Sequence, residues 1–169
     1  TVTGRGYLPL LTLEPRAGRN VLATHLAVMG AFDWATGPEI PLTIRSTTGG
    51  RSVRSAPGGS VRGYASGRFD STIKAIGNVE LRTTLPAIVL PQIVPGFVIY
   101  TDAGYFFDES ETSPAGEENS GLLLSSGAGI SLDLFDAAQF VFYTHYLWTE
   151  SSVAGDYWVP FSLGFGFHY

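Results

Sequence analysis

The sequence has no cysteine, little charge and no long apolar run, and each absence excludes a class of protein. Without cysteine the chain can form neither a disulfide nor a thiolate metal site. Charged residues make up only 15% of the 169 residues, which is low for the surface of a soluble domain. The net charge is −5 and the Lys and Arg residues are scattered, so the basic stripe that nucleic acid requires is missing. We therefore expect no nucleic-acid partner.

The apolar residues are distributed in a way that excludes an ordinary transmembrane helix, because no run of about 18 or more of them occurs. Aromatic residues nevertheless reach 13%, there are 21 glycines, and the mean hydropathy is +0.16. A transmembrane β-barrel reconciles these observations, since its lipid-facing residues alternate with lumen-facing ones and each strand is only half apolar. The chain starts at Thr1 without a signal sequence, so we expect a mature or truncated product.

Alternating apolar and polar positions predict an all-β chain. The expected strands span residues 1–13, 20–34, 73–85, 96–107, 121–134, 139–150 and 157–169, and residues 38–46 would make an eighth. The first segment is weak and its facing is ambiguous. Glu80 and Asp102 fall on the polar faces of their strands, where a lumen would lie.

A soluble β-sandwich would show the same alternation, with its apolar faces turned to a core. Three features favour lipid instead. The expected strands exceed the usual length of about 5–6 residues and suit a tilted membrane crossing. Shorter turns alternate with longer polar loops, as on the two sides of an outer-membrane barrel. Aromatic residues also collect near strand ends, as in interfacial girdles: Phe32, Trp34, Tyr105 to Phe107, Trp148, Tyr157 and Trp158.

The interval from residue 37 to 72 lacks this alternation and is rich in Gly, Pro, Ser, Thr and Arg. Unstructured stretches of more than about 12–15 residues are uncommon in compact domains and are usually functional or disordered. A mobile surface loop is one interpretation. The interval also contains apolar residues that a fully solvated loop does not need, among them Val61 and Tyr64. We therefore favour a loop that folds back into a cavity.

Several motifs resemble a known family when they are taken in order. They are VRGY at 61–64 after a Gly-Gly pair, ELR at 80–82, YTDAGYFF at 100–107, GAGISL at 127–132 and a terminal aromatic residue. Together they resemble the C-terminal barrel portion of the BamA and two-partner-secretion transporter superfamily, which includes surface antigens and outer-membrane assembly factors. GPEIPLTIRSTTGG at 37–50 is similar to the start of the sixth extracellular loop of that family. The resemblance covers about residues 20–169.

The resemblance implies a barrel of about 16 strands whose long loop enters the lumen. Arg62 matches the loop arginine, and Glu80 and Asp102 match the acidic residues of the inner wall. A guanidinium can bridge two carboxylates, and an unpaired carboxylate in a partly dehydrated cavity would be costly. Gly63 would permit the tight turn and Tyr64 would pack in the lumen. The alternatives are a solvated loop arginine and acidic residues that face water.

The strand count departs from the family pattern, because seven or eight strands are about half of such a barrel. We therefore expect residues 1–169 to be one outer-membrane barrel segment, with residues 37–72 as its lumen-directed loop. The segment would be the C-terminal half of a larger barrel, or of a barrel shared with a second copy or a complementary half. By resemblance, Phe165, Phe167 and Tyr169 mark the C-terminal strand and its assembly signal.

Enzymatic chemistry has little support in the sequence. His25, His145 and His168 lie on separate strands, all expected to face the lumen, without metal-ligand spacing. No G-x-S-x-G signature accompanies them, and the Gly127-Ala128-Gly129 segment lacks the context of a dinucleotide site. We expect no catalytic residue, no metal and no cofactor.

The function that the resemblance implies is physical rather than chemical. The barrel would assist insertion or transport of polypeptides across a bacterial or organellar outer membrane. An incoming strand would pair at a seam beside the C-terminal strand. The expected partners are outer-membrane lipid and an unfolded or secreted polypeptide. A passive pore, a membrane anchor for a larger protein and a secreted β-sandwich are the alternatives.

Overall fold

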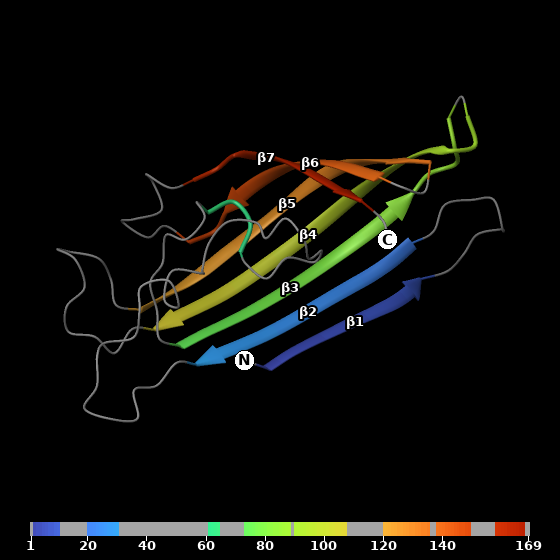
Figure 1. Cartoon of the computed structure of the whole chain (residues 1–169). Coiled ribbons are helices and arrows are strands. Elements are labelled where there is room, and N and C mark those ends of the chain that lie inside the picture. Colours follow the sequence, from blue (N-terminus) through green and yellow to red (C-terminus); the bar gives the residue numbers. More distant parts are fainter. Residues whose placement is uncertain are drawn as a thin grey trace.

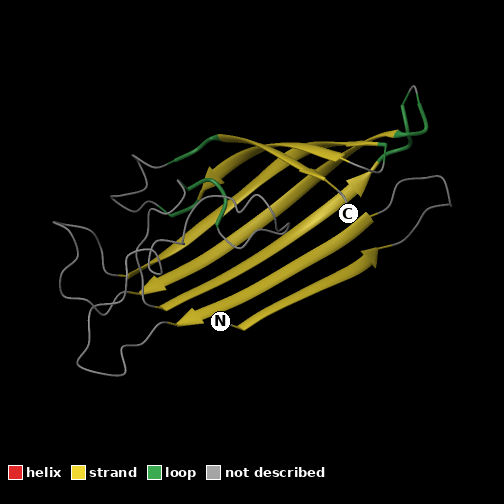
Figure 2. Cartoon of the chain, in the orientation of Figure 1, coloured by secondary structure: helices red, strands yellow, loops and turns green. Residues whose placement is uncertain are grey.

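The computed structural model describes eight stretches of the chain. They are residues 2–10, 20–30, 61–64, 73–88, 90–107, 120–135, 138–149 and 158–167. The described residues form strands and connections without a helix (Figure 2). Accordingly, this part of the chain has no helix of the length and apolarity needed to cross a membrane.

The strands form a single antiparallel sheet in the order β1-β2-β3-β4-β5-β6-β7. Their bounds are β1 Val2–Leu10, β2 Asn20–Gly30, β3 Ile73–Thr84, β4 Ile93–Phe107, β5 Ser120–Leu134, β6 Ala138–Leu147 and β7 Phe161–Phe167. The prediction of an all-β antiparallel chain is confirmed, and the described residues form seven of the seven or eight expected strands. The sheet is twisted and curved, and the segment 61–64 lies against one of its faces (Figure 1). It is consistent with part of a barrel but is not closed, because β1 and β7 are its two edges.

Several strand boundaries differ from the sequence prediction; β6, for example, ends at Leu147 rather than at residue 150. β4 begins at Ile93 rather than at residue 96, because its pairing with β5 continues to Leu134 after its pairing with β3 has ended. The last strand begins at Phe161 rather than at residue 157. Trp158 instead forms an isolated bridge with Tyr64, and so pairs with the 61–64 segment. The possible strand at 38–46 lies outside the described residues.

The register divides the sheet into an outer face with exposed apolar side chains and an inner face with buried ones. Exposed members of the outer face are Leu26, Val79, Ile99, Leu122, Ile130, Phe142, Phe161, Leu163 and Phe165. The register also settles the facing of the first strand. Arg5 pairs with the buried His25 and belongs to the inner face, whereas Gly4 pairs with the exposed Leu26. An apolar outer face is the arrangement expected of strands that contact lipid.

Of the expected girdle residues, Phe32, Trp34 and Tyr157 lie outside the described part of the chain, and one of the described ones departs from the expectation. Tyr105, Trp148 and Trp158 are exposed near strand ends. Phe106 is only 5% exposed, because the pleat of β4 turns it to the inner face. It belongs there to a cluster of buried apolar residues: Val61, Tyr64, Ile76, Phe106 and Leu123. The 61–64 segment thus contributes two side chains to the core of the inner face.

Candidate functional site

The two carboxylates singled out in the sequence lie on neighbouring strands of the inner face. Asp102 of β4 pairs with Asn78 of β3, and Glu80 follows two residues later on the same face. Both carboxylates are completely buried. Two like charges in such a place would repel one another and lose their hydration, so their burial requires a cation.

Arg62 lies between the two carboxylates. Its Nε donates to Asp102 Oδ2 at 2.7 Å and its Nη2 donates to Asp102 Oδ1 at 2.8 Å, which is a bidentate pair. Its Nη1 donates to Glu80 Oε2 at 2.5 Å. The main-chain N–H of Arg62 also donates to Asp102 Oδ2, at 3.0 Å. Asp102 therefore fixes both the side chain and the backbone of the segment.

Burial alone would disfavour the charge on Arg62. The hydrogen bonds and negative charges of Asp102 and Glu80 outweigh that effect and hold the pKa of Arg62 above its ordinary value. The guanidinium therefore stays charged.

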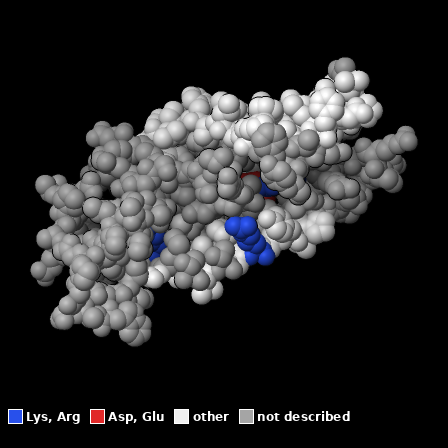
Figure 3. All heavy atoms as spheres, in the orientation of Figure 1, with Lys and Arg blue, Asp and Glu red and all other residues white. Residues whose placement is uncertain are grey.

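In the space-filling view, acidic and basic atoms form only small isolated patches among uncharged and undescribed surface (Figure 3).

A second arginine completes the charge cluster. Arg82 Nε donates to Glu80 Oε1, so Glu80 accepts from one arginine on each carboxylate oxygen. With Arg62 and Asp102, the cluster has two positive and two negative charges. In the sequence, Arg82 was named only as the last residue of the ELR motif at 80–82 and was given no role. Arg82 could have been found from its position two residues after Glu80, because that spacing puts both side chains on one face of the strand.

Two tyrosines that sequence reasoning did not assign to the site enclose the guanidinium. Arg62 Cζ lies 3.5 Å from the ring centroid of Tyr100 and 5.3 Å from that of Tyr143, within range of cation–π attraction. The two rings meet edge to face at 5.8 Å. Tyr100 could have been found from its spacing, because it precedes Asp102 by two residues and shares its face.

Glycines of β5 make room for these rings. A β-carbon at Gly127 would lie 2.7 Å from both Cε1 and the hydroxyl of Tyr100, and one at Gly129 would lie 2.8 Å from Cδ1 of Tyr143. Each tyrosine therefore lies across a glycine of the neighbouring strand. The sequence motif GAGISL thus supplies the space in which the guanidinium pocket is built.

The two residues after Arg62 complete the docking of the segment. Gly63 has φ +89°, and a β-carbon there would lie 2.9 Å from Cβ of His145. A larger residue is therefore disfavoured both by the backbone conformation and by the lack of space. The carbonyl of Gly63 accepts from the Val159 N–H at 2.8 Å. Tyr64 is 1% exposed, and its hydroxyl lies 2.6 Å from Thr149 Oγ1.

The histidines show no catalytic arrangement in the described residues. His25 Nδ1 lies 2.9 Å from Asn78 Oδ1. His145 lies between the hydroxyls of Tyr100 and Ser162. His168 lies outside the described residues, which contain no group of three acidic or histidine side chains that could hold a metal ion.

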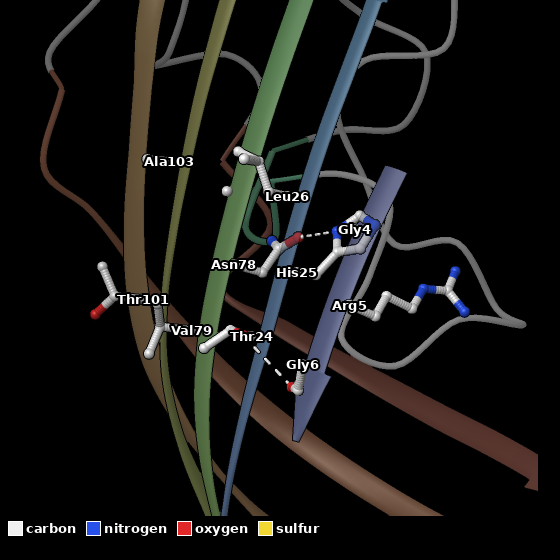
Figure 4. A pocket seen from close by; sticks show the side chains of 11 residues that line it. Gly4, Arg5, Gly6, Thr24, His25, Leu26, Asn78, Val79, Thr101 and Ala103 are labelled. Carbon is white, nitrogen blue, oxygen red and sulfur yellow. Dashed lines mark hydrogen bonds between the residues drawn. The ribbon is translucent and has the colours of Figure 1, made fainter. Parts of the chain in front are cut away.

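A pocket of about 530 Å³ lies over β1 to β4, apart from the charge cluster. Its lining includes small residues, Gly4, Gly6, Gly77 and Ala103, which leave space between larger neighbours. Figure 4 shows residues that line it, among them Arg5 of β1 and His25 of β2. Arg62, Glu80 and Asp102 do not line it.

The remaining sequence-predicted residues are only partly described. Of the long loop at 37–72, only residues 61–64 are described. Phe165 is 41% exposed on the outer face of β7. Phe167 pairs with Ala138 at the end of β7, and Tyr169 lies outside the described residues.

The family model described as the Omp85 superfamily domain matches residues 1–165. Neither the curated proteins nor the solved structures give a match.

Proposed function

The chain belongs to the Omp85 superfamily, whose members act in outer-membrane protein assembly and transport, and on this premise we propose that it helps polypeptides to insert into or cross an outer membrane. The membrane would be that of a bacterium or of an organelle derived from one. The partners would be outer-membrane lipid and an unfolded or secreted polypeptide.

The observation that carries the proposal is the docking of Arg62 between Glu80 and Asp102 on the inner face of a sheet whose outer face is apolar. Burying four charges is expensive, and an apolar cluster of similar volume is often as stable. The ion pairs instead add positional specificity, because the bidentate contact and the main-chain hydrogen bond with Asp102 are satisfied at only one position of the segment. We infer that the loop is locked against the wall and shapes the lumen.

The edge strand supplies a second argument. The described part of β7 has seven residues, whereas β4 and β5 have fifteen each. At about 3.4 Å per residue, β7 extends about 24 Å and β5 about 51 Å. The edge of β7 that pairs with no described strand would offer backbone groups to an incoming strand, and lipid-facing strands shorter than their neighbours would thin the bilayer beside them.

Strand direction bears on how the barrel would close. In an antiparallel sheet of seven strands, β1 and β7 run in the same direction. A second copy in the same membrane orientation would place β7 beside a parallel β1. A complementary half with an odd number of strands would pair antiparallel at both edges, as in outer-membrane barrels. We therefore favour a complementary half over a second copy.

The test is assembly of an unfolded outer-membrane β-barrel protein into liposomes that contain the full chain and whatever completes its barrel. We expect the chain to accelerate folding over empty liposomes and Arg62→Ala to remove most of that acceleration. Arg5→Ala is the matched control, because Arg5 is an exposed arginine on the same face. An assembly rate equal to that of empty liposomes, with a conductance altered by Arg62→Ala, would identify a passive pore instead.

A further inference from the structure

His145 occupies the junction between the charge cluster and the edge strand. It is 5% exposed on the inner face of β6. We propose that His145 is a positioning residue that couples the docking of the 61–64 segment to the attachment of β7. The coupling belongs to the folded sheet itself, and its use during assembly rests on the proposed function.

The first step is the row of residues across β4, β5 and β6. Tyr100 pairs with Gly127, and Gly127 pairs with His145. Because Gly127 has no side chain, the Tyr100 ring crosses β5 and its hydroxyl reaches His145 Nδ1. A residue with a β-carbon at position 127 would meet that ring. The glycine therefore permits a side-chain contact between two strands that are not neighbours.

The second step is the contact with the edge strand. His145 Nε2 lies 2.7 Å from the hydroxyl of Ser162 on β7. Both ring nitrogens thus have a hydroxyl partner, and hydroxyls can donate or accept, so either tautomer of the ring is satisfied. The chain of contacts runs from Tyr100 through His145 to Ser162.

The third step is the contact of the docked segment with Tyr100 and with His145. Arg62 covers the face of Tyr100, and the Gly63 backbone packs so closely on His145 that a β-carbon at Gly63 would be 2.9 Å away. Undocking of the segment removes the cation from the Tyr100 face and the backbone from the His145 side chain. Both changes free the imidazole to leave Ser162.

A second route joins the same parts through the backbone. Val159 N–H donates to the Gly63 carbonyl, and Trp158 bridges Tyr64. This route reaches the residues that precede β7, whereas the imidazole route reaches inside the strand at Ser162. The two routes are separable, because Ser162→Ala removes only the imidazole route and leaves the backbone route intact.

The experiment is amide hydrogen exchange of β7 in the full chain with its completed barrel, measured with and without Arg62→Ala. In the otherwise unmodified protein we expect Arg62→Ala to accelerate exchange of the β7 amides about tenfold, equivalent to about 1.4 kcal/mol. In a Ser162→Ala background we expect the same substitution to accelerate exchange less than about threefold. Tyr100→Phe, which removes the other hydroxyl partner of His145, should reduce the coupling in the same way.

Thr144→Val is the matched control. It removes a hydroxyl from the neighbouring position of β6, whose bond goes to the Ala128 carbonyl on the exposed side. This background should keep the tenfold response. Equal responses in the Ser162→Ala and unmodified backgrounds would overturn the proposal and assign the coupling to the backbone route.

His145→Phe should behave like Ser162→Ala, because the phenyl ring keeps the volume and loses both hydrogen bonds. If His145→Phe does not fold, Ser162→Ala and Tyr100→Phe still decide the question. If Arg62→Ala leaves β7 exchange unchanged in the otherwise unmodified protein but still slows assembly, the role of His145 is refuted and the proposed function stands.

Discussion

Neutralising Asp102 should release the 61–64 segment far more than neutralising Glu80. Asp102 accepts hydrogen bonds from three nitrogens of Arg62, and Glu80 accepts from one nitrogen of Arg62 and one of Arg82. The two carboxylates are equally buried. Any difference between the two variants therefore reflects how strongly each carboxylate binds Arg62 rather than how deeply it is buried.

The magnitude follows from the partners that lose a bond. In Asp102→Asn one carboxylate oxygen becomes an amide that faces a donor of Arg62, and the buried cluster acquires a net positive charge. Breaking a buried charge pair in this way costs about 3–5 kcal/mol, which lowers the docked-to-undocked ratio about hundredfold to several-thousandfold. Glu80→Gln removes one charged hydrogen bond, worth about 1.5–3 kcal/mol, and the partly exposed Arg82 recovers some hydration. Its effect should be about ten- to hundredfold.

The assay uses the absence of cysteine. Val61 is fully buried, so a single cysteine at Val61→Cys reacts with a maleimide only when the segment undocks. When docking is fast relative to labelling, the labelling rate measures the undocked population. A cysteine at the exposed Gln92 reports the intrinsic reactivity under the same conditions.

Asp133→Asn provides the matched chemical control. Asp133 lies on the inner face of β5, where it accepts from Gln139 at 2.6 Å, far along the strand from Asp102. Labelling at position 61 should not change in this variant. If Asp102→Asn and Glu80→Gln accelerated labelling equally, or if neither differed from Asp133→Asn, the assignment of Asp102 as the main anchor of Arg62 would be wrong.

Three further predictions use the same protein. Gly63→Ala should accelerate labelling at position 61 at least about fivefold, because a positive φ alone costs a non-glycine residue about 1–2 kcal/mol; an unchanged rate would contradict it. Tyr64→Phe should accelerate labelling about fivefold, since it loses one hydrogen bond worth about 1 kcal/mol to Thr149; a rate equal to that of the parent would rule out that contact. Gly127→Ala should lower the free energy of unfolding by about 3 kcal/mol, measured in urea by tryptophan fluorescence, through overpacking. Gly77→Ala is its control, because a β-carbon there meets nothing within 4 Å, and equal losses would refute the overpacking.

The sequence predicted correctly which face of the sheet most side chains occupy. It predicted poorly which side chains on different strands contact one another. Alternation has a period of two, so it placed Glu80, Asp102 and His145 on the inner face without knowledge of the register. The assignment of Arg62 to the same cluster came from the resemblance rather than from periodicity. No local pattern near residue 62 identifies the wall that it contacts.

The contacts missed by the sequence analysis depend on the register of three strands at once. Tyr100 reaches His145 only because both pair with the same glycine, and a shift of either strand by one residue would turn its side chains to the other face. The register in turn depends on connections whose conformation the sequence does not specify. Phe106 is a second example. The run of aromatic residues at 105–107 predicted an interfacial girdle, whereas the pleat of β4 turns Phe106 to the inner face.

Apolar burial and ion pairing have different roles in docking. Val61 and Tyr64 remove apolar surface from water, which stabilises the docked segment but allows it to slide, because such attraction is non-directional. The ion pairs, in contrast, are directional and hold the segment at one position. With the segment docked, the cluster is neutral; with the segment absent, Glu80, Asp102 and Arg82 leave one uncompensated negative charge on the inner wall. That wall therefore favours a cation at one position only, and the guanidinium meets both carboxylates only when Gly63 turns against His145. Undocking must break these contacts together, which makes the segment a two-state element rather than a loosely held one.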